Sequence, residues 1–188
     1  KALDAGVDMV CAQGTEGGGH TGDVANSVLI PAVVDVARRY KPPMLKGSTA
    51  LVLAAGGIHN GRGLASSLMQ GATGVWVGTR FILTDEAGAP KAHKEAVRTA
   101  GHDDNIRTII FTGRPMRVRN NPYINDWEVN RQQEMKELAA KGTIPYEADL
   151  DKFMGEGAEH KGVESNNAAA ESEDDDDFDD PLEQFRPY

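Results

Sequence analysis

Short apolar runs alternate with longer segments of mixed polarity through the first hundred residues. Three of these runs have the length of a β-strand and are almost wholly apolar, which is typical of parallel strands buried on both faces. They cover residues 7–13, 49–55 and 74–77. The segments that follow them are predicted to be helices, over residues 31–40, 61–70 and 90–100. This alternation predicts an α/β fold with a parallel sheet.

Proline and glycine mark where the predicted helices begin and end. Pro31 stands at the favoured first position of one helix, and Gly71 follows the end of the next. Asp126 is expected to cap a last helix that runs to Lys141. Residues 1–6 read as the last turns of a helix whose start is absent. We therefore expect the true N-terminus to be missing.

The composition favours an intracellular globular protein. Hydrophobic residues make up 39% of the 188 residues. The one cysteine, Cys11, cannot form an internal disulfide, which favours a reducing compartment, and its apolar surroundings predict that it packs as a small hydrophobic residue. No apolar run approaches the ~20 residues of a membrane helix. We expect a cytoplasmic location and no membrane partner, and the sequence predicts no particular oligomeric state.

The acidic charge of the chain is concentrated near its C-terminal end. The formal net charge is −9, and 13 of the 29 acidic residues but only 3 of the 20 basic ones follow residue 150. Because the rest of the chain is close to neutral, we expect no nucleic-acid partner. Residues 155–180 lack apolar periodicity and are predicted to be a disordered acidic insertion or tail. Residues 1–154 then form the folded domain, and residues 181–188 begin a truncated C-terminal segment.

Glycine-bearing loops follow all three predicted strands. The first, residues 17–22, contains G-x-G-x-x-G, which occurs in dinucleotide-binding sites. In such a site the glycines open a helix and the next strand ends in an acidic residue. Here the next helix is predicted to begin well after the glycines and the next strand ends in glycine, so the dinucleotide-binding interpretation fails. The other two, residues 56–58 and 78–80, lie one strand–helix unit apart. In (β/α)₈ barrels, such consecutive loops often bind phosphate through backbone N–H groups. The spacing favours a phosphate site over two ordinary tight turns.

Other polar residues give weaker signals. Arg114, Arg117 and Arg119 could contact a phosphate, or they could be solvated surface and ion-pair residues of the scaffold. Glu16 could orient a neighbour or bind substrate, and His59 is expected to begin the following helix rather than act as a base. The five histidines show no metal-ligand spacing, so no metal site is predicted.

Three segments together resemble the nitronate monooxygenase family, formerly called 2-nitropropane dioxygenases. They are Ala12-Gln13-Gly14-Thr15-Glu16-Gly17-Gly18-Gly19-His20-Thr21-Gly22, Ala54-Ala55-Gly56-Gly57-Ile58 and Val77-Gly78-Thr79-Arg80-Phe81. The resemblance runs from residue 1 to about residue 154. It implies the C-terminal part of an FMN-dependent (β/α)₈ TIM barrel. It also implies that nitronates or nitroalkanes are oxidised by O₂ to carbonyl compounds and nitrite.

The same resemblance assigns roles to individual residues. His20 would be the catalytic base, and histidine is the side chain whose unperturbed pKa suits proton abstraction near neutrality. A loop histidine that only hydrogen-bonds the backbone is the alternative. The residues implied to bind FMN are Gln13, Gly18, Gly56, Gly57, Trp76, Val77, Gly78 and Thr79.

Two other functions remain open at this point. An enoyl reductase of the same flavin-barrel superfamily would share the glycine–histidine loop but would take its electrons from a nicotinamide. A truncated, non-catalytic remnant would bind no flavin, and its acidic tail would bind basic partners in a salt-sensitive way.

Overall fold

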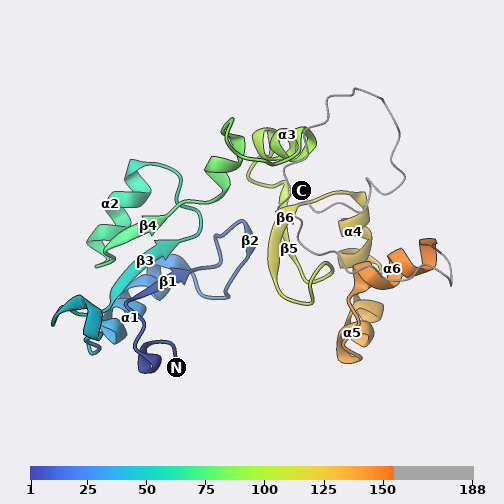
Figure 1. The fold of residues 1–188 in the computed structure, drawn as a ribbon. Coiled ribbons are helices and arrows are strands. Elements are labelled where there is room, and N and C mark those ends of the chain that lie inside the picture. Colours follow the sequence, from blue (N-terminus) through green and yellow to red (C-terminus); the bar gives the residue numbers. More distant parts are fainter. Residues whose placement is uncertain (155–188) are drawn as a thin grey trace. The chain divides into compact units, whose positions relative to one another are not determined.

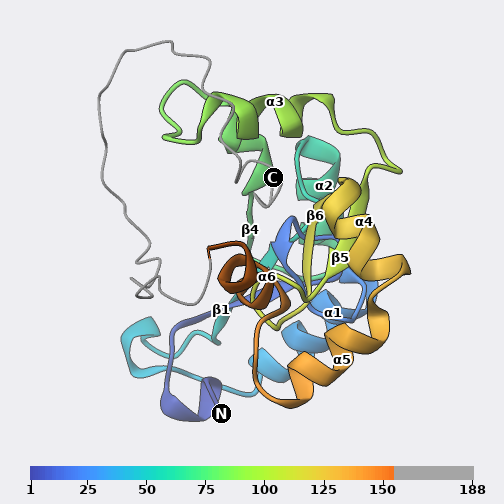
Figure 2. The same cartoon turned by 90° about the vertical axis from the view of Figure 1, so that its right-hand side faces the viewer.

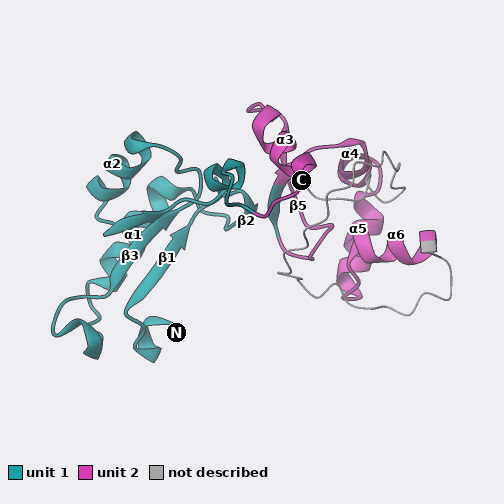
Figure 3. Cartoon of the chain, turned by 45° about the horizontal axis from the view of Figure 1, so that its top comes forward, with its two compact units in different colours: residues 1–87, 115–117 teal, residues 88–114, 118–188 magenta. Residues whose placement is uncertain are grey.

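The computed structural model describes residues 1–154, so the predicted acidic tail and C-terminal segment lie outside the described residues. The chain divides into two compact units (Figure 3). Unit 1 consists of residues 1–87 and 115–117, and unit 2 takes residues 88–114 and those from 118 onward. The prediction that residues 1–154 form one domain remains a prediction.

Unit 1 is built on a three-stranded parallel sheet with the order β1-β3-β4 (Figure 1). β1 covers Met9–Gln13, β3 covers Leu51–Ala55 and β4 covers Gly74–Trp76. Between them run the helices α1 (Asn26–Ala37) and α2 (Gly61–Met69), and short 3₁₀ helices cover Leu3–Ala5, Pro43–Leu45 and Thr79–Leu83. The strand–helix alternation and the parallel pairing confirm the α/β prediction.

One face of this sheet carries the core of unit 1. Helix α1 packs against β1 and β3, and α2 packs against β4. The fully buried side chains come from alternate strand residues and from one side of α1; they are Ala12, Ile30, Val34, Ala37, Ala50, Val52, Ala54 and Ala72. Their burial supplies the hydrophobic free energy that orders the sheet.

The other face of the sheet is partly exposed, which corrects the expectation of strands buried on both faces. Met9 and Trp76 are 46% and 63% exposed, and Cys11 is also exposed rather than packed in the core. Successive strand side chains point to opposite faces, and within residues 1–154 both covering helices lie on one face. Partial burial raises the pKa of the Cys11 thiol above its ordinary value.

Helix α1 begins five residues before the predicted position. It starts at Asn26 and contains Pro31 in its interior, where proline ordinarily disfavours a helix. The start is fixed by Glu16, whose two carboxylate oxygens accept the backbone N–H of Asn26 at 3.1 Å each. A carboxylate at this end of a helix is stabilised by the helix dipole. The cap lies ten residues upstream, so no local start signal was present.

A short strand, β2 (Gly19–His20), replaces part of the loop predicted after β1. It pairs antiparallel with the first two residues of β6 (Met116–Arg119), so that His20 faces Met116 in the register. In unit 2 the last residues of β6 lie beside β5 (Asn105–Thr108). The pairing joins residues almost one hundred positions apart, and a two-residue strand carries no periodicity from which it could be predicted.

Unit 2 is mainly helical. Its helices are α3 (Lys91–Thr99), α4 (Pro122–Val129), α5 (Gln132–Ala140) and α6 (Pro145–Met154), and α5 contacts both α4 and α6 (Figure 2). The expectation that Asp126 caps a helix running to Lys141 is wrong. The Asn121 side chain accepts the N–H of Ile124, and Pro122 follows at the favoured first helical position. The helix then ends at Val129 and a new one begins.

A polar cluster joins α4, α5 and α6. Asp149 accepts two hydrogen bonds from Arg131, at 2.7 and 2.8 Å, and one from the indole N–H of Trp127, at 3.0 Å. The hydroxyl of Tyr123 also donates to Asp149, at 3.2 Å. The guanidinium of Arg131 lies 3.5 Å from the centre of the Trp127 ring, a cation–π contact. The carboxylate of Glu134 accepts two further hydrogen bonds from Arg131.

The polar cluster predicts that the stability of unit 2 falls in acid. Hydrogen bonds from Arg131 lower the pKa of Glu134 to about 2. Burial raises the pKa of Asp149, but the hydrogen bonds and charge of Arg131 outweigh it, and the pKa lies below its usual range. A carboxylate with a lowered folded-state pKa stabilises the fold above its unfolded-state pKa of about 4, and this contribution is lost as the pH falls through the folded value.

We therefore expect the urea midpoint of unfolding to drop between about pH 5 and pH 2. Glu134→Gln removes one of the two titrating groups, so the variant is expected to show a shallower drop over the same range. The measurement is urea unfolding by circular dichroism at pH 7, 5, 4, 3 and 2. An unchanged midpoint in the wild type between pH 5 and pH 3 would contradict the assignment.

Candidate active site

The three glycine-bearing loops of unit 1 follow strand ends that are aligned with one another in the parallel sheet. In the strand register Gln13 stands beside Ala55, and Ala55 stands beside Trp76. The loops that follow β1, β3 and β4 therefore start side by side at the carboxyl ends of the strands, which is where α/β enzymes place their sites. All nine residues predicted for catalysis and FMN binding lie in unit 1.

His20 is held through its backbone. The side-chain amide of Gln13 donates to the His20 carbonyl oxygen at 2.5 Å, and the N–H of Thr21 donates to the Pro115 carbonyl oxygen at 3.0 Å. The residue itself is exposed. The structure thus gives Gln13 a contact with the histidine-bearing segment, in addition to the flavin contact that the sequence resemblance implies.

The loops touch one another at glycine residues. A Cβ atom at Gly18 would lie 2.5 Å from the Thr79 hydroxyl oxygen, and one at Gly56 would lie 3.0 Å from the backbone N of Gly17. A Cβ at Gly57 would lie 2.9 Å from the Cβ of Glu16. These approaches leave no room for a side chain at the three glycines, so the glycine backbone packs directly against the backbone of Gly17 and the side chains of Glu16 and Thr79. The structure therefore brings the predicted Gly18, Gly56, Gly57 and Thr79 together.

Asn26 and Glu16 connect two of these loops. Glu16 was expected to orient a neighbour or to bind substrate, and its contact with Asn26 favours the first role, whereas no role was predicted for Asn26. The Asn26 amide accepts the N–H of Gly14 at 2.9 Å and donates to the carbonyl oxygen of Gly56 at 2.5 Å. Glu16 binds the backbone of Asn26, as described above. These partners lie 10 to 30 residues apart, and no motif of the sequence points to them.

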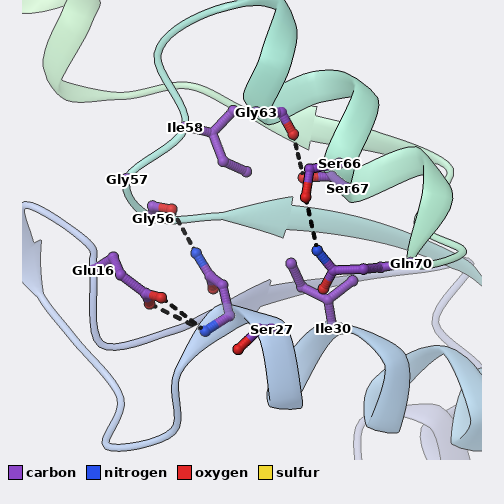
Figure 4. A pocket seen from close by; sticks show the side chains of 11 residues that line it. Glu16, Ser27, Ile30, Gly56, Gly57, Ile58, Gly63, Ser66, Ser67 and Gln70 are labelled. Carbon is purple, nitrogen blue, oxygen red and sulfur yellow. Dashed lines mark hydrogen bonds between the residues drawn. The ribbon is translucent and has the colours of Figure 1, made fainter.

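An open groove of about 260 Å³ lies beside this junction (Figure 4). Figure 4 shows residues from the loop after β1, from α1, from the loop after β3 and from α2 around it. The lining residues are Glu16, Asn26, Ser27, Ile30, Gly56, Gly57, Ile58, Gly63, Ser66, Ser67 and Gln70. Of the predicted site residues, only Gly56 and Gly57 line this groove. His20, Gln13 and the segment of residues 76–79 lie outside it.

Arg117, Arg119 and His59 contact backbone carbonyl oxygens of the protein itself. Arg117 donates to the Thr15 carbonyl oxygen at 2.9 Å in unit 1, and Arg119 donates to the Ala96 carbonyl oxygen at 3.1 Å in unit 2. These contacts favour the scaffold interpretation for both. His59 contacts the Gly57 carbonyl oxygen at 3.2 Å, and Asn60 after it caps α2. Among residues 1–154, no group of three potential ligands is placed to hold a metal ion.

Replacing Gly56 tests whether the backbone junction is required. Gly56 has φ = +98°, a conformation in which an alanine is strained, and its Cβ would press against the backbone N of Gly17. We expect Gly56→Ala to lower the free energy of unfolding by about 1–2 kcal/mol. The matched control is Gly61→Ala, where a Cβ meets no atom within 4 Å and the residue is helical, so stability should rise slightly. Equal urea midpoints for the two variants would contradict the packing described here.

The family model for nitronate monooxygenase matches residues 1–176. The chain belongs to the nitronate monooxygenase family. Enzymes of this family are oxidoreductases and are generally flavin-dependent. No helix within residues 1–154 is long and apolar enough to cross a membrane.

Relatives within and around this family carry different names. A curated Mycobacterium tuberculosis protein named (3aS,4S,5R,7aS)-5-hydroxy-7a-methyl-1-oxo-octahydro-1H-indene-4-carboxyl-CoA dehydrogenase is 44% identical over 113 residues, which are 60% of this chain and 30% of that protein. The chain spans about a third of the length of the first curated relatives it matches. One of these relatives carries the word monooxygenase in its name and two are named a dehydrogenase, so the family alone does not define the substrate.

Two solved structures share the fold. FabK from Thermotoga maritima matches with a TM-score of 0.55 and 30% identity, over 77% of this chain and 46% of that one. A nitroalkane oxidase from Streptomyces ansochromogenes matches with a TM-score of 0.52 and 34% identity, over 66% and 36%. Both are TIM-barrel enzymes. The predicted fold class, part of a (β/α)₈ barrel, is confirmed.

Proposed function

We propose that this protein oxidises nitronates and nitroalkanes to carbonyl compounds and nitrite, with FMN as cofactor, O₂ as oxidant and His20 as general base. The observation that carries the proposal is the meeting of three glycine loops at the carboxyl ends of β1, β3 and β4, with an exposed histidine in the first of them. Membership of the nitronate monooxygenase family and the likeness to a nitroalkane oxidase support it.

The loops suit a flavin mononucleotide. A Cβ added at Gly19 or Gly78 would meet no atom within 4 Å, so a ligand can approach the backbone at both places. Backbone N–H groups of such loops are good donors to phosphate oxygens. Gly57 and residues 76–79 would hold the phosphate end, and Gln13 and Gly18 would contact the rest of the cofactor. When bound, the flavin would supply the two-electron oxidation and the transfer of electrons to O₂.

The protein itself supplies proton transfer and positioning. His20 would remove the proton from the carbon beside the nitro group, which converts a neutral nitroalkane into its nitronate. The Gln13 amide and the antiparallel pairing of β2 with Met116 hold the backbone of His20 on both sides. A base held in this way loses less orientational freedom when the substrate binds. The partners required are thus a small nitro compound and O₂.

Product analysis tests this proposal. The purified protein, supplied with FMN, a nitronate and air, should release nitrite and the matching carbonyl compound while it consumes O₂. The same mixture without FMN, and the same mixture without protein, are the controls. Nitrite release no faster than in the protein-free control would contradict the proposal.

A reductase is the second candidate. FabK shares the fold, and one curated relative is named a dehydrogenase of a CoA-linked compound. Such a reductase would take electrons from NAD(P)H and pass them to its substrate. It would not need His20 to deprotonate a nitroalkane. The two candidates differ in which compound reduces the flavin.

A further inference from the structure

Asn26 is the first residue of α1 and lies where the loops after β1 and β3 meet. Both ends of its side-chain amide are used. The oxygen accepts the Gly14 N–H at 2.9 Å, and the nitrogen donates to the Gly56 carbonyl oxygen at 2.5 Å. Asn26 therefore bridges two backbone groups that belong to different loops and are separated by 42 positions in the chain.

The surroundings of Asn26 hold its amide in place. The two oxygens of Glu16 bind the Asn26 backbone N–H, which fixes the direction in which the side chain leaves the helix. A side chain at Gly14 would collide with the Asn26 amide oxygen, so the glycine permits the close approach of its N–H. Figure 4 shows the Glu16 carboxylate and Gly56 on either side of this junction. A carboxamide is the one short side chain that both accepts and donates through separate atoms.

We propose that Asn26 is a positioning residue for flavin binding: its amide sets the distance between the loop after β1 and the loop after β3. The first loop carries Gly18 and His20, and the second carries Gly57, so the relative placement of the two loops defines the shape of the cofactor site. This inference rests on the proposed function, because it needs FMN to bind against both loops. It assigns Asn26 no contact with the substrate.

The inference separates flavin affinity from the chemical step. The backbone of His20 is held by Gln13 and by Met116, and neither contact involves Asn26. Asn26→Ala removes both bridging hydrogen bonds, and we expect it to raise the Kd for FMN about 10- to 100-fold. At saturating FMN, kcat should remain within about twofold of the wild type. Asn26→Asp keeps the acceptor for Gly14 but turns the donor that faces Gly56 into a second acceptor, so it should bind FMN no better than Asn26→Ala.

Asn60→Ala is the matched control. Asn60 is also an asparagine at a helix start, and its side chain accepts the N–H groups of Arg62 and Gly63 at 3.0 and 3.1 Å. Loss of this cap should lower the Tm by several degrees, so the control carries a stability loss of its own. The control does not join the two loops, so its Kd for FMN should stay near the wild-type value.

The experiment is a titration of each purified variant with FMN, in which quenching of the flavin fluorescence reports binding. Amide hydrogen exchange of residues 14–17 and 56–58 is measured on the same variants. Weak FMN binding and faster exchange in both segments of Asn26→Ala, with both properties normal in Asn60→Ala, would support the inference. Equal Kd values for the two variants would overturn it while leaving the proposed function intact. A wild-type protein that binds no FMN would contradict the proposed function itself, and the inference with it.

Discussion

His20→Asn is expected to lose activity on neutral nitroalkanes while keeping most of its activity on preformed nitronates. Asparagine is close in size to histidine but cannot take up a proton near neutrality. Loss of a general base typically costs about 10²- to 10⁴-fold in rate, or roughly 3–5 kcal/mol of activation free energy. A nitronate ionised in solution has already lost the proton, so it should escape most of this penalty.

The measured quantity is the ratio of kcat/KM for the two forms of one substrate, in wild type and in variant. FMN content serves as the control, because the backbone contacts of His20 with Gln13 and Met116 are retained when its side chain changes. A histidine that only supports its loop would reduce both activities equally, with loss of flavin. If the ratio does not change, His20 is not the base.

Asp149→Ala is expected to destabilise the helical part of unit 2 by about 3 kcal/mol. The side chain of Asp149 is only 13% exposed, and it accepts hydrogen bonds from Tyr123, Trp127 and Arg131. Its removal leaves the Arg131 side chain, which is 24% exposed, without its principal partner, and breaking a partly buried ion pair from one side is destabilising. Because α6 carries Asp149, α4 carries Tyr123 and Trp127, and Arg131 stands at the start of α5, the contacts among the three helices are lost together.

Asp126→Ala provides the comparison for this prediction. The Asp126 carboxylate accepts one hydrogen bond from the Asn130 side chain at 2.8 Å, between exposed groups of one segment. Its loss should cost about 0.5 kcal/mol or less. The measurement is urea unfolding at pH 7, followed by circular dichroism. A cost for Asp149→Ala as small as that for Asp126→Ala would show that the polar cluster does not join the helices energetically.

Local signals in the sequence were sufficient for the strands β3 and β4 and for the helix α2. Residues 51–55 and 74–76 lie inside predicted apolar runs, and α2 ends where glycine follows, with φ = +94° at Gly71. Both the apolar pattern and the glycine determine the structure of residues close to them in sequence, so they can be recognised before the tertiary structure is known. The family could likewise be recognised from the glycine–histidine segment and the two later glycine loops.

The errors in the predictions arose where a distant residue decides the local structure. The start of α1 depends on Glu16, ten residues before Asn26, and β2 depends on residues 116–117. Asn26 was missed because its partners, Gly14 and Gly56, become neighbours only when β1 and β3 pair. The burial of both strand faces was predicted from the apolar runs alone, and an apolar run does not reveal which of its sides a helix covers.

Anaerobic mixing tests the central claim most directly. The protein loaded with FMN should lose its yellow flavin absorbance when a nitronate is added without oxygen, and the absorbance should return, with release of nitrite, when air is admitted. Addition of NADH or NADPH under the same conditions should leave the absorbance unchanged. Bleaching by NAD(P)H together with no bleaching by the nitronate would contradict a nitronate-oxidising function and favour the reductase.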